Sequence, residues 1–424
     1  MPTKALRNRL VGALWPQSLA GRGSRFLTPD DIGRPSKAVR TVHCVWHKTQ
    51  GLLGLPKPWM DRWNLLQQEQ QKNNENLFGP IHNESKSSIS YRAKRKSIYV
   101  YPDLKKCPPD PQQARKALEV LSEPGEPVSK YEIQEIIGGG GYGTVFSAKE
   151  RDNGKDVAIK QCDPHYVSKL PSLFLNELLA LRICKHPNVV SLIACHMAFP
   201  IDEDSKLSNN LSISVRVPFL VMEYMETSLY NLLNLVYPAN SLPEKMATFV
   251  MREVLTGMAF LHQKGVVHRD LKSDNILLSR NGKVKIADFG LSCRFAYRDE
   301  EFESTIGTCL WMSPEMIQCK PYTFRADIWS LGILFIELID GEPPYMDLLN
   351  GGEAKDAIMK LIIVHPPVRP KREISPELED VFRATLRYRS ERRLSCTSIL
   401  MMPALQNVSS MDRFASYVSS VLKF

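Results

Sequence analysis

The sequence predicts an α+β protein in which a small β-rich lobe is followed by a larger helical lobe. Alternating apolar runs that are typical of strands gather between residues 131 and 225. Apolar residues at helical spacing dominate from residue 246 onward. A group of strands followed by a group of helices indicates an α+β architecture rather than alternating βα units.

The individual elements can be placed in order within this outline. Strands are expected at residues 131–150 (two strands joined by a glycine turn), 156–163, 188–198 and 218–225. Helices are expected at residues 173–184, 246–263 and 327–340, and a short hairpin at residues 276–278 and 284–286. Residues 201–216 read as a flexible insertion between two strands.

The composition is that of a globular protein. The 424 residues are 43% hydrophobic and 24% charged, which excludes a collagen, a wholly disordered chain and a small disulfide scaffold. No run of about 18 apolar residues predicts a membrane span. The nine cysteines form no C-x-x-C pair, which favours reduced thiols and a cytoplasmic location.

The basic charge belongs to the N-terminal third. Residues 1–130 hold 22 Lys and Arg against 11 Asp and Glu, whereas residues 131–424 hold 33 against 35. The main domain is therefore not expected to bind nucleic acid. Residues 1–30 read as a disordered basic tail, as a segment that contacts anionic membrane, or as a mitochondrial transit peptide. Residues 67–127, which include a basic cluster at 92–96, read as a flexible linker.

A glycine-rich run opens the predicted β-rich lobe. Gly138, Gly140 and Gly143 are followed by a β-branched and aromatic run rather than by a helix, so they fall in a hairpin. Without Cβ atoms, such a hairpin can lay backbone N–H groups over a polyphosphate. The alternative is a surface hairpin without a ligand.

Two charged residues follow this hairpin. Lys160 ends an apolar strand and is a candidate partner for phosphate oxygens. Glu177, on the next predicted helix, is a candidate to hold Lys160 in place. Each residue, taken alone, is more often an exposed surface charge.

Residues 268–275 and 287–290 carry the strongest chemical signal. Phosphoryl transfer needs a carboxylate for the hydroxyl proton, a cation near the moving phosphoryl group, and oxygen ligands for magnesium. Asp270 supplies the carboxylate, Lys272 the cation, and Asn275 with Asp288 the oxygens. The hairpin predicted between these two motifs brings both of them to one site.

In this order the motifs resemble a eukaryotic protein kinase domain over residues 128–406. The motifs are G-x-G-x-x-G-x-V, A-x-K, H-R-D-L-K-x-x-N, D-F-G and Ser313-Pro314-Glu315. HRDLKSDNILL, GTCLWMSPE and DIWSLGILFIELIDGEPPY look most like the PAK group, the kinases regulated by Rho-type GTPases. The resemblance implies a bilobal serine/threonine kinase fold with an N-lobe at 128–225, a C-lobe at 226–406 and a tail at 407–424.

The resemblance also implies ATP, Mg²⁺ and protein substrates, and it assigns roles to residues. Asp270 would be the catalytic base, assisted by Lys272, Lys160 and Glu177, with Asn275 and Asp288 as magnesium ligands. The residues implied to bind ATP are Ile137, Gly138, Gly139, Gly140, Gly141, Tyr142, Gly143, Thr144, Val145, Ala158, Lys160, Met222, Glu223, Met225 and Leu277.

The segment after the second motif is expected to control activity. An arginine beside the base, Arg269, is a natural partner for a phosphate, so phosphorylation is predicted at Ser304 or Thr305. By resemblance, Thr308 belongs to the serine/threonine pattern. The resemblance also pairs Glu315 with Arg393 in a buried ion pair.

Residues 31–66 resemble, in degenerate form, the CRIB segment through which PAK kinases bind Rho-type GTPases. The resemblance rests on Ile32, Pro35, His43, the run Gly51–Pro56 and Trp59. It implies binding by strand addition to the GTPase sheet. A decayed segment that docks on its own kinase lobe remains the alternative.

A pseudokinase or GTPase-binding scaffold without phosphotransfer is the competing function. Cys309 and Leu310 replace a proline and a tyrosine of the PAK pattern, and Arg389 stands where an aspartate is usual. Glu337 and Glu342 hint at a preference for basic residues before the phosphoacceptor.

Overall fold

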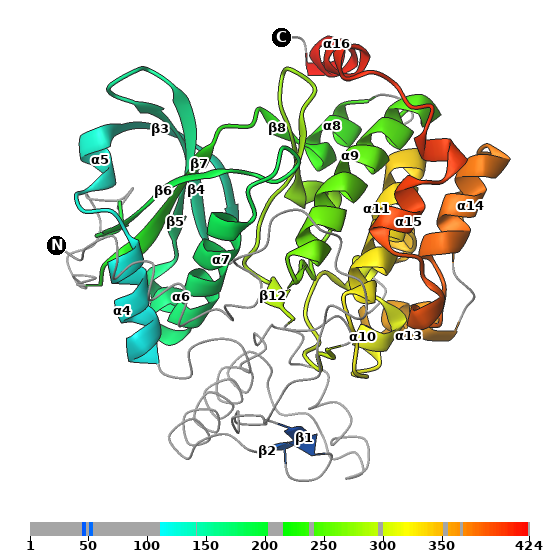
Figure 1. Ribbon diagram of the computed structural model, residues 1–424, viewed down its shortest axis with the longest axis horizontal. Coiled ribbons are helices and arrows are strands. Elements are labelled where there is room, and N and C mark those ends of the chain that lie inside the picture. Colours follow the sequence, from blue (N-terminus) through cyan, green and yellow to red (C-terminus); the bar gives the residue numbers. More distant parts are fainter. Residues whose placement is uncertain are drawn as a thin grey trace.

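The computed structural model describes most of the chain from residue 111 onward (Figure 1). The described ranges are 45–47, 51–53, 111–140, 142–201, 215–236, 241–295, 300–350, 355–364 and 368–422. The predicted tail 1–30, most of the CRIB-like segment 31–66, the basic cluster 92–96, Gly141 and nearly all of the insertion lie outside these ranges. Within the CRIB-like segment, β1 (Val45–His47) and β2 (Gly51–Leu53) pair as antiparallel strands.

The N-terminal lobe is built on one antiparallel sheet of five strands in the order β3-β4-β5-β7-β6. The strands are β3 (Tyr131–Gly140), β4 (Gly143–Glu150), β5 (Asp156–Cys162), β6 (Leu192–Ala198) and β7 (Val217–Glu223). Their β-branched and apolar residues, such as Val157, Ile159 and Val221, are fully buried. The β-rich lobe predicted from the sequence is confirmed.

Two helices follow β5 and pack against this sheet. Asp163 begins α6 (Pro164–Lys169), because its carboxylate accepts hydrogen bonds from the backbone N–H groups of His165 and Tyr166. The next helix, α7 (Pro171–Ile183), is buried along almost its whole length and runs beside the sheet (Figure 1). Asn176 on α7 donates a hydrogen bond to the backbone oxygen of Ser292, so this helix also contacts the second lobe.

The C-terminal lobe is helical and is organised around α11. Its helices are α8 (Leu229–Leu235), α9 (Glu244–Gln263), α10 (Pro314–Ile317), α11 (Arg325–Asp340), α12 (Met346–Asn350), α13 (Lys355–Val364), α14 (Pro376–Thr385), α15 (Cys396–Leu400) and α16 (Met411–Leu422). Every residue of α11 from Ala326 to Ile339 is buried, as expected of a helix that is apolar on all sides. Among the described residues, no helix is long and apolar enough to cross a membrane.

Short strands connect the helical lobe to the site. β10 (Ile276–Leu278) and β11 (Val284–Ile286) form the hairpin expected from the sequence, and β8 (Thr227–Ser228) joins its other edge. β9 (Val266–Val267) pairs with β12 (Cys293–Arg294). These two small sheets hold the ends of the segments that carry Asp270 and Asp288.

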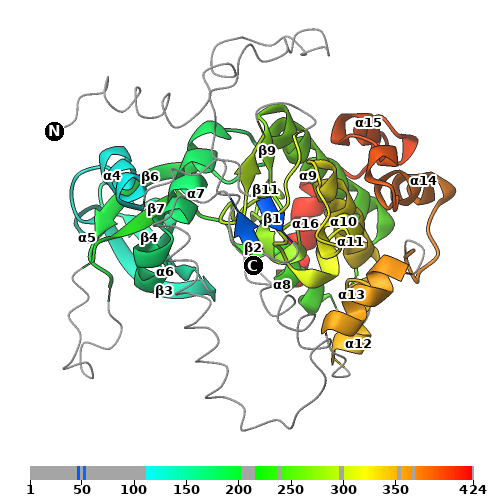
Figure 2. The same cartoon turned by 90° about the horizontal axis from the view of Figure 1, so that it is seen from below.

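Two regions differ from the sequence-based prediction. The end of the predicted linker forms α4 (Pro111–Leu121), which buries Ala114, Leu118 and Leu121 against the N-terminal lobe, and α5 (Pro127–Lys130) follows it. The predicted tail after residue 406 contains α16, whose Phe414 ring lies 5.0 Å from the ring of Phe249. In the second view, α4 lies beside β6 and α7, and α16 lies beside α8 and α9 (Figure 2).

Candidate active site

A buried lysine joins the sheet to a helix and to the second lobe. Lys160, on β5, places its Nζ 2.7 Å from Oε1 of Glu177 on α7 and 3.5 Å from Oδ1 of Asp288 in the C-terminal lobe. Burial opposes the charge of the lysine, but the two carboxylates outweigh it and raise the pKa of Lys160 above its ordinary value. Lys160 is therefore a cation at neutral pH, fixed where the two lobes meet.

Asp288 stands at a strained turn with half of its carboxylate exposed. Its backbone has a φ of 60°, a left-handed conformation that non-glycine residues rarely adopt. Its Oδ1 accepts a hydrogen bond from the N–H of Gly290 at 3.2 Å. Burial raises the pKa of Asp288, but Lys160 and this N–H group outweigh burial and bring the pKa below its ordinary value. The carboxylate is thus ionised and 45% exposed, as a cation ligand requires.

Asp270 is held by three polar side chains. Its Oδ1 accepts from Oγ1 of Thr308 at 2.7 Å, and its Oδ2 accepts from Nδ2 of Asn275 at 3.1 Å. Lys272 places its Nζ 3.4 Å from Oδ2 of Asp270 and 3.1 Å from Oγ1 of Thr308. The structure therefore brings together the carboxylate, the cation and the amide that the sequence analysis singled out.

The segment that carries Thr308 approaches the Asp270 loop closely because of a glycine. Gly307 has a φ of 123°, and a Cβ there would lie 2.7 Å from the backbone oxygen of Arg269. No L side chain fits without moving one of the two segments. Gly307 therefore sets the position of Thr308 over Asp270.

Asp327 anchors the backbone of the Asp270 loop and was not predicted from the sequence. Its carboxylate accepts from the backbone N–H groups of His268 at 2.9 Å and Arg269 at 2.8 Å. The ring of His262 lies 2.9 Å away, and the pKa of Asp327 is lowered because these hydrogen bonds outweigh burial. The sequence did offer one indication of this role, because Asp327 is an acidic residue in the first turn of the otherwise apolar helix α11.

The glycine hairpin is predicted to cover a polyphosphate, and the structure shows that its glycines meet different surroundings. Gly143 has a φ of 151°, and a Cβ there would lie 2.2 Å from the backbone oxygen of Gln161 on the next strand. At Gly138 and Gly139 a Cβ would meet no protein atom closer than 3.8 Å. Gly143 is therefore required by packing, whereas Gly138 and Gly139 leave open backbone in the hairpin.

The residues implied to surround a base lie on β5, β7, β10 and the segment after β7. Ala158 on β5 pairs with Met222 on β7, and Met225 is buried just beyond that strand. Leu277 on β10 pairs with Ser228 on β8 in the small sheet of the C-terminal lobe. The carboxylate of Glu223 contacts the N–H of Ser191 and lies 2.8 Å from Lys285, so Glu223 offers only its backbone to a ligand.

Arg269 reaches the segment proposed to control activity. Its NH1 lies 2.9 Å from Oγ of Ser304, and Tyr322 donates its hydroxyl to the backbone oxygen of Ser304 at 2.8 Å. Thr305 instead donates to the backbone oxygen of Met316 at 3.2 Å. The geometry separates the two candidate phosphorylation sites, because only Ser304 faces the arginine.

Glu315 and Arg393 form a two-pronged ion pair. NH1 and NH2 of Arg393 lie 2.5 Å and 2.8 Å from the two carboxylate oxygens of Glu315. Arg393 is 1% exposed, and its guanidinium lies 5.2 Å from the centre of the Trp329 ring. This pair ties the segment after Thr308 to the base of the C-terminal lobe.

Of the two carboxylates that hint at a preference for basic residues before the phosphoacceptor, Glu337 is buried and therefore not open to a substrate side chain. Glu337 is 2% exposed and accepts from Oγ of Ser273 at 2.5 Å and Nε1 of Trp311 at 3.1 Å. Glu342 pairs with Lys371 at 3.1 Å. Burial raises the pKa of Glu337 to about 7, although its two donors oppose that rise.

A pH-dependent stability follows for Glu337. Its pKa is higher in the folded chain than in the unfolded chain, so its stabilising contribution is full at low pH and is lost as pH rises toward 7. We expect the free energy of unfolding to lose roughly 2–3 kcal/mol from this group between pH 5 and pH 8. Chemical denaturation of Glu337→Gln should lack that loss, whereas Glu342→Gln should retain it. An equal pH dependence in wild type and Glu337→Gln would contradict this account.

Asn275 and Asp288 fit a magnesium ion that is also bound by phosphate oxygens. The amide nitrogen of Asn275 donates to the backbone oxygen and to Oδ2 of Asp270, and its amide oxygen accepts no hydrogen bond from a described residue. Its backbone oxygen accepts from the N–H of Ala287 at 2.8 Å, which brings it next to Asp288. Magnesium in phosphoryl-transfer sites takes few protein ligands and completes its shell with phosphates and water.

Comparison with known proteins gives a consistent result. A family model described as protein kinase domain matches residues 131–405. The chain is 36% identical over 308 residues to serine/threonine-protein kinase pakA of Talaromyces marneffei, covering 72% of this chain and 44% of that protein. It is 34% identical over 308 residues to serine/threonine-protein kinase ste20 of Emericella nidulans, covering 72% and 33%. It is 32% identical over 296 residues to serine/threonine-protein kinase PAK mbt of Drosophila melanogaster, covering 70% and 43%. The matched region spans less than half the length of each relative.

Proposed function

The chain belongs to the protein kinase family, and from this premise we propose that it is an ATP-dependent serine/threonine kinase of PAK type. It would transfer the γ-phosphoryl group of Mg-ATP to serine or threonine hydroxyls of proteins. The observation that carries the proposal is the ion cluster of Lys160, Glu177 and Asp288, which joins the two lobes beside Asp270. A scaffold that binds no nucleotide has no need of this arrangement.

Each charged group would have a separate task. Asp270 would orient the substrate hydroxyl and receive its proton, and Lys272, beside it, would stabilise charge on the moving phosphoryl group. Lys160 would hold the α- and β-phosphates. Asn275 and Asp288 would hold magnesium, which supplies charge neutralisation between the phosphates. Catalysis would thus consist mainly of positioning and charge stabilisation.

The remaining contacts to ATP follow from the hairpin and the strands around it. The glycine hairpin between β3 and β4 would cover the phosphates with open backbone at Gly138 and Gly139. Ala158 and Leu277 would enclose the base, and the backbone of residues 223–225 would bind its edge. Met222, which is partly buried, would limit the depth of the base pocket.

The test of this function is transfer of radiolabelled γ-phosphate from Mg-ATP to a basic test protein by the purified full chain. Label recovered on serine and threonine supports the proposal. ATP binding without any label above background supports the competing pseudokinase function. The assay thus decides between the two functions directly.

Regulation by phosphorylation is expected at Ser304 rather than at Thr305. A phosphate on Ser304 would accept charge-assisted hydrogen bonds from Arg269, which already lies 2.9 Å from the hydroxyl. We expect Ser304→Ala to lower the activity of phosphorylated enzyme roughly tenfold by removing this pair. Thr305→Ala is the matched control and should retain most activity. Full activity in Ser304→Ala would refute the assignment.

A regulatory role for residues 31–66 is the second part of the proposal, and it is supported by the CRIB resemblance. We expect a GTP-loaded Rho-type GTPase to retain the full chain more strongly than its GDP form in a pulldown. A chain that begins at Pro111 keeps α4, which packs on the N-terminal lobe, and should not be retained. Equal retention with GTP and GDP would reject GTPase binding. Equal kinase activity of the two chains would contradict a regulatory role of the N-terminal region in the isolated protein.

A further inference from the structure

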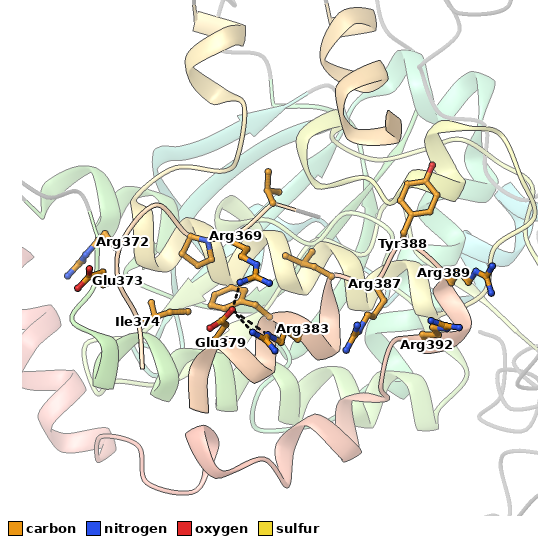
Figure 3. Close-up of a pocket in the computed structure, with 14 residues that line it drawn as sticks. Arg369, Arg372, Glu373, Ile374, Glu379, Arg383, Arg387, Tyr388, Arg389 and Arg392 are labelled. Atoms are coloured by element: carbon orange, nitrogen blue, oxygen red, sulfur yellow. Dashed lines mark hydrogen bonds and ion pairs between the residues drawn. The ribbon is translucent and has the colours of Figure 1, made fainter. Parts of the chain in front are cut away.

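A basic groove lies at the base of the C-terminal lobe, beside α14 and away from the candidate active site. It has a volume of about 1000 Å³ and is lined by α14 and by the segments before and after this helix (Figure 3). We call it the arginine groove after its six arginines: Arg369, Arg372, Arg383, Arg387, Arg389 and Arg392. Only two acidic residues, Glu373 and Glu379, share this lining. The groove therefore concentrates positive charge.

Half of these arginines already have partners. Arg369 and Arg383 both pair with Glu379, and Arg372 donates to Oγ of Ser241 at 2.7 Å. Since one carboxylate serves two guanidinium groups, even this half of the groove keeps an excess of positive charge.

The other three arginines form no ion pair with a described residue. Arg387, Arg389 and Arg392 are exposed, and their side chains form no hydrogen bond or ion pair with any residue that the structure describes. They follow α14 on one short segment, with Tyr388 among them (Figure 3). These three exposed guanidinium groups share their segment with a single carboxylate, that of Glu391, so this part of the groove keeps an excess of positive charge with which an anion can pair.

The positive charge is a local feature of this lobe. Residues 131–424 together hold 33 Lys and Arg against 35 Asp and Glu, so no general basic field surrounds the groove. Binding to nucleic acid or to a lipid surface depends on many cations spread over an extended face. A compact groove of six arginines is better matched to a short anionic segment.

The shape of the groove adds apolar contacts to the charge. Val368, Pro370 and Ile374 line it together with the buried Phe382 and Leu386. Guanidinium groups bind carboxylates with two parallel hydrogen bonds, which gives directional recognition. Guanidinium groups beside apolar side chains suit a peptide in which acidic and apolar side chains are mixed.

We propose that the arginine groove is a docking site for an acidic segment of a partner protein. The chain's own N-terminal region is a poor occupant, because residues 1–130 carry twice as many basic as acidic residues. No residue of the groove belongs to the candidate active site, so docking leaves that site accessible. The proposal is independent of phosphotransfer.

A binding experiment with the full chain tests the proposal. The probe is a short fluorescent peptide of glutamate and leucine, and its uncharged counterpart replaces each glutamate with glutamine. Arg387→Gln, Arg389→Gln and Arg392→Gln together should weaken binding of the acidic peptide roughly tenfold, since exposed pairs each contribute modestly. The matched control changes Lys155, Lys320 and Arg413 to glutamine, which removes the same charge from other exposed positions.

Each outcome of this experiment is decisive. Tight binding to the acidic peptide, loss in the groove variant and retention in the control support the docking site. No binding, equal binding of the glutamine peptide, or equal loss in the control overturns it. Arginine-dependent binding of an RNA oligomer or an anionic vesicle, without binding of the peptide, also overturns it. If the triple variant unfolds, the single change Arg389→Gln, with a smaller expected loss, replaces it.

Discussion

Replacing Asp270 by asparagine is expected to slow phosphotransfer by about 10²–10⁴-fold, the usual contribution of a general base. Asparagine keeps the shape of the side chain and can still accept from Thr308, which donates to Oδ1 at 2.7 Å in the wild type. It cannot take the substrate proton or balance the charge of Lys272. The loss should appear in kcat, while the KM for ATP changes little, because Asp270 does not hold the nucleotide.

The matched control for this prediction is Asp412→Asn on the exposed face of α16. Its rate should equal that of the wild type. Steady-state kinetics and a separate measurement of ATP affinity give both parameters. An Asp270→Asn enzyme as fast as wild type would show that another group accepts the proton.

Replacing Arg393 by alanine should be the most destabilising single change at the base of the C-terminal lobe. The change leaves the carboxylate of Glu315, only 11% exposed, without its ion-pair partner. It also leaves two backbone oxygens without their hydrogen-bond donor. These are the oxygens of Arg387 and Arg325, which accept from Arg393 at 2.8 Å and 3.0 Å. Breaking one side of a buried ion pair typically costs about 3–5 kcal/mol, and we expect a loss of that size in the free energy of unfolding.

Arg392→Ala provides the comparison, because it removes an adjacent arginine whose side chain is exposed and unpaired among the described residues. Its effect should stay within about 0.5 kcal/mol, as for other surface substitutions. Chemical denaturation of the two variants at one pH measures the difference. Equal stability of both would mean that the Glu315 pair contributes nothing to folding.

The parts of the fold set by local sequence were predictable. The strands of the N-terminal lobe, the hairpin Ile276–Leu278 with Val284–Ile286 and the buried helix α11 each follow from apolar periodicity over a few residues. The cluster around Lys160 was expected only because several motifs occurred in order. No periodicity places Lys160 within 3.5 Å of Asp288, which lies 128 residues further along the chain.

The features missed by sequence reasoning depend on distant contacts. The helix α4 follows a polar linker, and only its packing on the N-terminal lobe shows that Leu118 and Leu121 are core residues. Asp327 binds the backbone of His268 and Arg269 from 58 or more residues away. The choice of Ser304 over Thr305 likewise needs the position of Arg269, which spacing along the chain does not supply.

The measurement that tests the account most directly is labelling with an ATP-derived acyl phosphate probe, which transfers a reporter to a lysine amine beside bound phosphates. We expect mass spectrometry of the full chain to find the reporter on Lys160 and to find it suppressed by excess Mg-ATP. Labelling confined to lysines other than Lys160 and Lys272, or labelling of Lys160 that Mg-ATP leaves unchanged, would contradict a nucleotide site between Lys160, Asp270 and Asp288.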